Sequence, residues 1–257
     1  MDVFNSLHTV DNLPTPWRIR VRVTRMWPSF RDAGANFMGI NLILLDDDDY
    51  HVHAFVNREV WQVWNHFIEE GSVYDISRFL TVDAAGKLRP VSSPNIFFFT
   101  NVTVCQQIVN PPINIPMHKF EFKTIESLYS AFFFDEQDEV PIFSTDVVGV
   151  VSNIQPVRNI AMRYREKILF RFDLEDTWHS VKVNLWDSII GDVPQRLQSL
   201  GNEPAIIIIA SCKYVLSRGN IVLSSIASTK IYINLAHDAV NDMRASFFNE
   251  DEVPPIG

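Results

Sequence analysis

The chain has 257 residues, enough for one large domain or two small ones. Hydrophobic residues make up 47% of it and charged residues 21%, a balance typical of globular proteins. Its 22 basic and 31 acidic residues give a formal net charge of −9, but eleven of the acids fall within the segments 46–49, 135–139 and 250–252. The remaining acids nearly balance the basic residues, so the net charge does not exclude a nucleic-acid partner.

The composition also excludes several classes of protein. No apolar run reaches ~18 residues, so no membrane span is expected, and the N-terminal residues lack the pattern of a signal peptide. Cys105 and Cys212 are too few for a disulfide framework or a four-cysteine zinc site, and they suit a reducing nuclear or cytosolic setting. The acids of 46–49 predict a solvated turn. Because the chain lacks a phosphate-binding loop and a nucleophile set, we expect no metal, no cofactor and no enzymatic activity.

Hydrophobic alternation with period two runs through the first half of the chain. It predicts strands over 17–26, 37–45, 50–57, 72–82 and 91–104. Pro28 is expected to end the first strand, with a loop over 29–36. In the third strand the outward positions are His51, His53 and Phe55. A helix is expected over 58–70, because apolar residues recur there every three or four positions and Gly71 supplies a stop.

The same order repeats in the second half. Strands are predicted over 146–153, 167–174, 181–186, 205–215 and 221–233, with a short helix near 188–200. Two five-stranded units, each with a helix between its third and fourth strands, have the layout of the OB-fold. This small Greek-key barrel holds oligonucleotides on the face of its second and third strands. We therefore expect an all-β protein with short helices, built from two tandem OB-fold barrels.

The domain boundaries follow from these units. The first barrel is expected over 1–110, and the second, with a closing helix at 237–247, over 144–248. Three prolines make 111–143 a stiff linker, which is expected to contain a short helix at 124–132. An acidic tail completes the chain at 249–257.

Single-stranded nucleic acids are bound by rings that stack on bases and by basic groups that contact the backbone. In the second unit, Trp186 shares an outward strand face with Lys182, and Tyr214 is a second candidate ring. In the first unit, Phe55 and His53 lie on the matching strand. The flanking loops carry the other candidates, namely Trp27, Arg31, Lys87, Arg89, Arg158, Arg163, Arg165 and Arg218.

Each candidate also has an ordinary structural explanation. Trp186 could fold over the next helix as part of the core, and His53 could be a neutral surface histidine. A single arginine is usually a solvated charge. The repeated placement of basic residues in the loops of both units favours binding. The arginines at 18, 20 and 22 are left out, because the polar face of a strand is often merely solvated.

Several segments, taken in their order, resemble the large subunit of replication protein A from plants. Residues 17–27 are similar to the start of that family's first central DNA-binding domain, and 73–79 with Arg89-Pro90 to its fourth strand and following loop. Segment 118–128 resembles the linker between the two central OB-folds. The start, the stacking strand and the closing helix of the second OB-fold resemble 146–150, 184–186 and 243–248. The likeness covers about residues 14–250.

The resemblance implies a nuclear protein that binds single-stranded DNA in replication, repair, recombination and telomere maintenance. It implies stacking by Trp186 and by Tyr214 or Val215 in the second unit, and by Phe55 or Val56 in the first. Leu88 stands where the family usually has another ring, which implies weaker binding by the first unit. Other replication protein A subunits and repair proteins are the implied partners, and no membrane is implied. Because the family's outer domains are not visible, the likeness is to a shortened paralogue or a fragment.

Two other functions remain open from the sequence. OB-folds also bind proteins, and an interaction module would suit the acidic net charge and the leucine at position 88. Binding of single-stranded RNA would use the same surfaces as binding of DNA.

Overall fold

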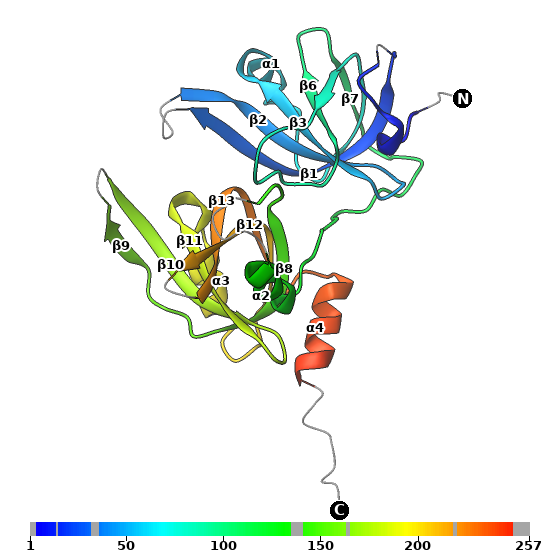
Figure 1. Ribbon diagram of the computed structural model, residues 1–257. Helices are drawn as coiled ribbons and strands as arrows, with labels where there is room; N and C mark the ends of the chain where they lie inside the picture. The colour runs from blue at the N-terminus through cyan, green and yellow to red at the C-terminus, as the bar shows by residue number, and fades with distance from the viewer. Residues whose placement is uncertain are drawn as a thin grey trace, which may run out of the picture. The chain divides into compact units, whose positions relative to one another are not determined.

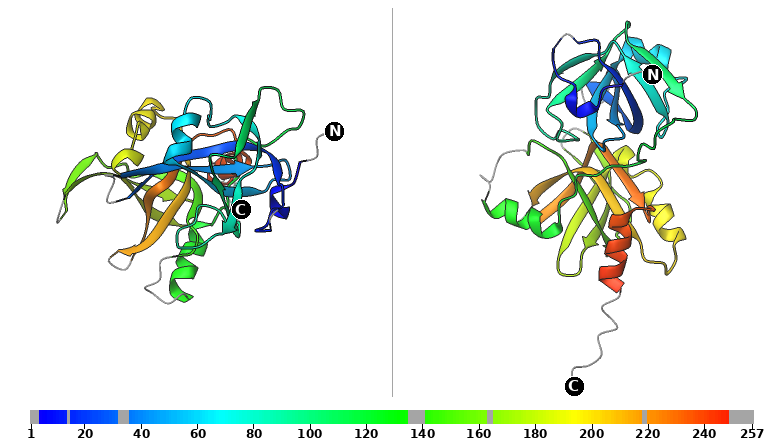
Figure 2. Two further views of the ribbon diagram at one scale, coloured as in Figure 1. Left: turned by 90° about the horizontal axis from the view of Figure 1, so that it is seen from above. Right: turned by 90° about the vertical axis from the view of Figure 1, so that its right-hand side faces the viewer.

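The computed structural model describes residues 4–13, 15–31, 36–134, 141–162, 165–217 and 220–248. The chain divides into two compact units, Met1–Phe120 and Glu121–Gly257. Strands provide most of the regular structure in each unit and the helices are short (Figures 1 and 2). The expectation of an all-β protein with short helices is therefore confirmed. No described helix is long and apolar enough to cross a membrane.

The first unit is a strongly curled sheet. Its elements are η1 (Leu7–Thr9), β1 (Arg18–Arg31), β2 (Asn36–Leu45), β3 (His51–Asn57), α1 (Arg58–Trp64), β4 (Val73–Ser77), β5 (Leu80–Asp83), β6 (Asn95–Phe99) and β7 (Val104–Ile108). The strand order is β5-β6-β3-β2-β1-β4-β7, and β3 pairs with β6 in parallel. The chain turns at Arg78, where φ is 58°. As a result, β4 and β5 act as one bent strand, paired in antiparallel fashion with β7 and β6.

The second unit is a closed ring of strands. Its elements are α2 (Ile125–Phe134), β8 (Thr145–Ser152), β9 (Arg158–Ala161), β10 (Glu166–Glu175), β11 (Ser180–Trp186), η3 (Asp187–Ile189), α3 (Val193–Ser199), β12 (Ile206–Ser217), β13 (Asn220–Ile233) and α4 (Asp238–Phe248). The order is β11-β13-β12-β8-β10-β9, and an additional pairing of β11 with β10 closes the ring. The parallel pair here is β11 with β13.

Both units have the chain order of the OB-fold. Three antiparallel strands are followed by helical turns and two more strands, and the third strand pairs in parallel with the fifth. The prediction of two tandem OB-folds is therefore confirmed. The predicted helices near 124–132 and 237–247 are found as α2 and α4. The acidic stretch at 135–139 and the tail at 249–257 lie outside the described residues.

Period-two alternation explains both cores. In β3, Val52, Ala54 and Val56 are almost completely buried, and in β11 the same holds for the alternate residues Val181, Val183 and Leu185. These side chains join one hydrophobic cluster in each unit. Because a strand points successive side chains to opposite faces, the residues between them face outward. The register of the sheet therefore decides which outward residues become neighbours.

The first strand runs further than the sequence predicts. Pro28 does not end β1, which continues to Arg31 and places Pro28 opposite Ile40 of β2. Beyond Arg22, β1 pairs with β2 alone, because its ladder with β4 covers only residues 18–22. One side of the strand is an open edge there, and an edge tolerates a residue that has no N–H to donate.

The helix expected over 58–70 is shorter in the structure. Asn57 caps α1 by accepting a hydrogen bond from the Val60 amide at 2.9 Å, but the helix ends at Trp64. The reason is the buried Tyr74. Its hydroxyl accepts from the Glu69 amide and donates to the Phe67 carbonyl, both at 2.8 Å. These bonds hold 67–69 in a turn rather than in a helix.

The prediction that His51 faces solvent is wrong, because only 3% of its surface is exposed. His51 lies directly opposite Leu45 in the ladder of β2 and β3. Leu45 packs with Val73 and Ile115 in a small cluster outside the main core. The segment around Ile115 thus covers this end of the outward face, which alternation within one strand does not reveal.

Candidate nucleic-acid interface

The outward face of the second unit carries a row of polar side chains across four strands. Arg171 of β10 lies opposite Asn184 of β11, Asn184 opposite Ser224 of β13, and Ser224 opposite Lys213 of β12. The Nε of Arg171 donates to the Asn184 Oδ1 at 2.8 Å. Residues paired across a sheet project from the same face. The row therefore presents two cations and hydrogen-bonding groups on one surface.

Trp186 borders this row and is held in a fixed orientation. Its indole Nε1 donates to the Ser224 Oγ at 3.0 Å, and its backbone amide donates to the Ser225 Oγ at 2.9 Å. The Nζ of Lys167 lies 5.3 Å from the centre of the ring. The ring is only half-buried. Proteins that bind single strands use an oriented, accessible ring beside a cation, because a base stacks on the ring and a phosphate contacts the cation.

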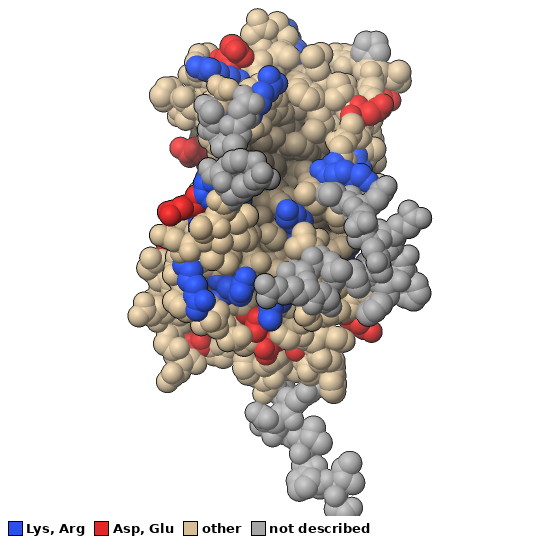
Figure 3. Space-filling view, turned by 60° about the vertical axis from the view of Figure 1, so that its left-hand side comes forward, with Lys and Arg blue, Asp and Glu red and all other residues tan. Residues whose placement is uncertain are grey.

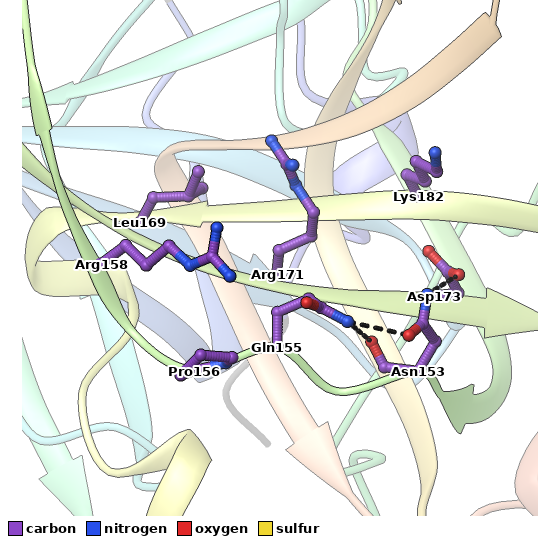
Figure 4. A pocket seen from close by; sticks show the side chains of 8 residues that line it. All are labelled: Asn153, Gln155, Pro156, Arg158, Leu169, Arg171, Asp173 and Lys182. Carbon is purple, nitrogen blue, oxygen red and sulfur yellow. Dashed lines mark hydrogen bonds between the residues drawn. The ribbon is translucent and has the colours of Figure 1, made fainter.

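A cavity of about 260 Å³ opens on the same face, lined by Asn153, Gln155, Pro156, Arg158, Leu169, Arg171, Asp173 and Lys182. Figure 4 shows the side chains of Arg158 and Arg171 at this cavity, with Lys182 on the neighbouring strand. Three cations and one carboxylate give the lining an excess of positive charge. Leu169, which lies opposite both Arg158 and Trp186, supplies an apolar floor.

The structure thus brings together three of the predicted residues of the second unit. Trp186, Lys182 and Arg158 share the face around the cavity. Arg165 is exposed just before β10. Arg163 and Arg218 lie outside the described residues. Basic side chains gather on one face of the second unit in the space-filling view (Figure 3).

Tyr214 lies elsewhere. It is opposite the buried Leu223 in the ladder of β12 and β13 and packs against the hydrophobic core. The Nζ of Lys123 lies 5.6 Å from its ring centre. The neighbouring Lys213 takes the outward position instead, because β12 contains a bulge between Ala210 and Cys212 that shifts its register.

The first unit presents aromatic rings at the comparable place. Trp27, Asn41, Phe55 and Phe98 lie opposite one another across β1, β2, β3 and β6. The rings of Phe55 and Phe98 meet edge to face, with centres 5.9 Å apart. Gly39, with φ 144°, makes room for this arrangement, because a Cβ there would come within 2.9 Å of the Phe55 Cζ.

His53 and Trp27 form a stacked pair on this face. Their ring centres are 5.6 Å apart and their planes differ by 16°. A hydrogen bond of 2.9 Å joins the His53 Nε2 to the Asn41 Oδ1. Loss of hydration, together with the nearby charge of Arg25, lowers the pKa of His53 to about 4. At neutral pH the stacked pair of Trp27 and His53 is therefore uncharged.

The predicted loop residues of the first unit are more dispersed. Arg31 is exposed at the end of β1, and Lys87 is exposed in the loop between β5 and β6. The Nη1 of Arg89 donates to the Ala84 carbonyl at 2.8 Å, so this side chain braces its own loop. Leu88 is half-buried with a φ of 56°.

Arg20 and Arg22 of β1 serve the fold, which agrees with leaving them out of the candidates. Arg20 makes a two-pronged ion pair with the buried Asp75, at 2.6 and 2.9 Å. Arg22 donates to the carbonyls of Ile115 and Gly71. These contacts tie β1 to β4 and to the segment after β7, so the two side chains are used inside the first unit.

Asp46 and the two cysteines have structural surroundings. Asp46 is buried and accepts from the amides of Leu7 and Tyr50 at 2.7 and 2.8 Å. Burial raises the pKa of the Cys105 thiol to about 12 and that of Cys212 further. Within the described ranges, no group of three or more His, Cys, Asp and Glu residues is placed to hold a metal ion.

Sequence reasoning missed Lys167, Arg171 and Lys213. Arg171 was within reach of a strand pattern, because Phe170 and Phe172 on either side of it are buried. To identify Lys167, the register of β10 against β11 must be known, in which Leu169 lies opposite Trp186. To identify Lys213, the bulge in β12 must be known. For Lys167 and Lys213 the missing information was the register between neighbouring strands of the sheet.

The fold and these faces define a class: a tandem OB-fold protein with accessible rings on both units and basic groups around one of them. A family model described as a domain of unknown function, DUF223, matches residues 8–122. A 70 kDa DNA-binding subunit of replication protein A from Arabidopsis thaliana is 26% identical over 226 residues, which cover 85% of this chain and 27% of the relative. Replication factor A protein 1 of Schizosaccharomyces pombe is 26% identical over 178 residues, 66% of this chain and 27% of the relative.

A solved structure supports the same fold. A chain of a replication protein A heterotrimer bound to ssDNA matches with a TM-score of 0.63 at 19% identity, over 96% of this chain and 55% of that one. The predicted resemblance to replication protein A large subunits is therefore confirmed. This chain spans about a quarter of the length of the curated relatives it matches.

Proposed function

We propose that this chain is a non-enzymatic binder of single-stranded DNA. Bases stack on the outward rings of two OB-folds, and the basic groups of the second unit contact the phosphates. Two observations of similarity support the proposal: the relatives that match by sequence are replication proteins, one of them described as a DNA-binding subunit, and the matching heterotrimer was solved with ssDNA.

The surroundings of Trp186 carry the proposal. An indole held by two serine hydroxyls, with a lysine beside its ring, lies next to a cavity with three cations. The lysine beside the ring and the cations of the cavity distinguish this environment from that of a core tryptophan, because charged groups are rarely buried in a hydrophobic core. The sequence-independent combination of a ring and a basic groove suits single strands of any sequence.

The cellular role is proposed from the same similarity. We assign the chain to DNA replication in the nucleus, with repair and recombination as related uses of a single-strand binder. Other subunits of a replication protein A complex and repair proteins are the proposed partners. Segment 111–143 is the proposed linker between the barrels. It buries Ile115 in the first unit, and Ile125 and Leu128 in the core of the second.

Replacing one tryptophan tests the site directly. The change Trp186→Ala is expected to weaken binding of a labelled oligo(dT) of ~30 nucleotides by roughly fivefold or more, because stacking contributes ~1–3 kcal/mol per base. Fluorescence anisotropy measures the affinity, and circular dichroism checks the fold.

The matched control is Trp178→Ala. Trp178 belongs to the turn between β10 and β11, is 81% exposed and does not line the cavity. Its loss is expected to leave the affinity unchanged. Equal affinities for the wild type and Trp186→Ala would contradict the site. If the wild type did not bind at micromolar protein, the OB-folds would be better explained as a protein-interaction module.

A further inference from the structure

The cavity beside Trp186 has more polar groups than phosphate binding requires. Arg158, Arg171 and Lys182 suffice for an anion, yet the lining also includes Asp173 and the amides of Asn153 and Gln155. A carboxylate repels a phosphate. Asp173 lies opposite Lys182 in the ladder of β10 and β11, and its carboxylate gives the edge of the cavity an acceptor for a ligand that carries hydrogen-bond donors as well as negative charge. Nucleotides have both, the donors on the base and the charge on the phosphate.

The carboxylate of Asp173 is held in place by a chain of hydrogen bonds (Figure 4). The Nδ2 of Asn153 donates to the Asp173 Oδ2 at 2.8 Å. The side-chain Nε2 of Gln155 donates to the Asn153 Oδ1 at 2.8 Å, and the backbone N–H of Gln155 donates to the backbone carbonyl of Arg171 at 2.8 Å. The two amides thereby fix the orientation of the carboxylate. Orientation in advance of binding is what recognition of a base edge needs.

The position of Asp173 suits reading of a base. Asp173 is half-buried and lies on the same strand face as Arg171 and Leu169, at spacings of two residues. A base that enters over Leu169 would meet donors from Arg171 and an acceptor from Asp173. A carboxylate accepts hydrogen bonds and does not donate them. Cytosine presents an amino group at N4, whereas thymine presents the acceptor O4 at the equivalent place.

We propose that this cavity reads one base of the bound strand, that it favours cytosine over thymine, and that Asp173 is the specificity-determining residue. The inference rests on the proposed binding of single-stranded DNA and adds a base preference to it. Elsewhere on the two units, stacking gives only modest preferences among bases and phosphate contacts give none.

The test compares labelled oligo(dC) and oligo(dT) of equal length with the full chain. A homopolymer always fills the cavity with the same base, so the change in the ratio of the two dissociation constants between the wild type and a cavity variant reports on the cavity. The wild type is expected to bind oligo(dC) roughly fivefold more tightly, the effect of one hydrogen bond of about 1 kcal/mol.

Three variants test the role of the carboxylate. Asp173→Asn is expected to abolish the preference, because the new amide can donate to O4 of thymine. Removing a negative charge also strengthens binding to any DNA, but this effect cancels in the ratio. Glu175→Gln removes the same charge two residues along the same strand, outside the cavity lining, and is expected to keep the preference. Asn153→Ala, which releases Asp173 from its orienting bond, is expected to reduce it.

The outcomes separate the two levels of the account. Equal affinity of the wild type for both oligonucleotides, or a preference that survives Asp173→Asn, would overturn base reading and leave single-strand binding intact. Failure of the wild type to bind either oligonucleotide would overturn the proposed function, and base reading with it.

Discussion

Trp27 and Trp186 are both half-buried rings on an outward sheet face, yet their neighbours differ in charge. Trp27 stacks on an imidazole that is neutral at physiological pH, whereas Trp186 has the ammonium group of Lys167 beside its ring. A ring with a neutral neighbour contributes stacking alone. A ring beside a cation contributes stacking and an ionic contact together. Single residues thus give the two units different chemistry on the same fold.

The pKa of His53 predicts how acid affects the first unit. Its pKa is about 4 in the folded protein against 6.5 for an ordinary histidine, so the unfolded chain binds the proton more readily. Stability is therefore fully present above pH 6.5 and is lost as the pH falls toward 4. The loss approaches roughly 3 kcal/mol, because each unit of pKa difference corresponds to about 1.4 kcal/mol.

Urea unfolding at a series of pH values between 4 and 7 measures this effect. In His53→Gln, which keeps a group able to bond Asn41, the free energy of unfolding should depend less on pH over that range. The same pH dependence in the variant and the wild type would show that His53 does not carry the effect.

At the residue scale, the face on which a side chain lies could be predicted where alternation within one strand determines it. The alternation in 181–186 places Lys182 and Trp186 outward, as the structure does. His51 is covered by a segment far away in sequence, around Ile115, whereas the side of the sheet on which Tyr214 lies depends on the bulge between Ala210 and Cys212. Alternation gives the face of a side chain relative to its own strand. What covers that face is decided by tertiary contacts.

At the scale of elements, the order of strands was readable but several limits were not. Both OB-folds follow from turn residues and alternation. The sequence did not predict that β1 continues through Pro28, because this depends on an open sheet edge. It did not predict the short α1 either, because the hydroxyl of Tyr74 determines where this helix ends. Strand β9 lies within a predicted loop and pairs only with β10. Local propensity gives way to tertiary structure at each of these points.

The ladder of β10 and β11 makes a prediction about salt. It places Arg171 and Lys182 on the cavity face, where each neutralises a phosphate in the proposed complex. Affinity for single strands falls with salt by a slope of about 0.7 per neutralised phosphate. The double variant Arg171→Ala/Lys182→Ala should therefore lower the slope of log affinity against log salt by roughly 1.4.

The comparison variant is Trp27→Ala in the first unit. It should weaken binding and leave the salt slope unchanged, because the stacked pair of Trp27 and His53 carries no charge at neutral pH. Anisotropy titrations of labelled oligo(dT) over a range of salt concentrations give both slopes. An unchanged slope in the double variant would remove the two cations from the interface.

At the scale of the whole molecule, the net charge of −9 is a poor guide to the binding face. Eleven of the 31 acidic residues fall in the segments 46–49, 135–139 and 250–252, whereas three basic side chains line the cavity of the second unit. In the proposed complex, a strand held by one OB-fold is presented to the other at high effective concentration, because both belong to one chain. The account therefore predicts that a strand long enough for both units binds more tightly than a short one.

The central claim is that the two OB-folds bind single-stranded DNA in tandem. Its most direct test is an anisotropy titration of labelled oligo(dT) of ~30 nucleotides, since each OB-fold covers roughly 4–16 nucleotides. The titration is run at ~50 and ~200 mM salt, with a duplex of the same length as competitor. The account predicts tight binding that weakens with salt and that the duplex does not displace. No binding at micromolar protein, or equal competition by the duplex, would contradict it.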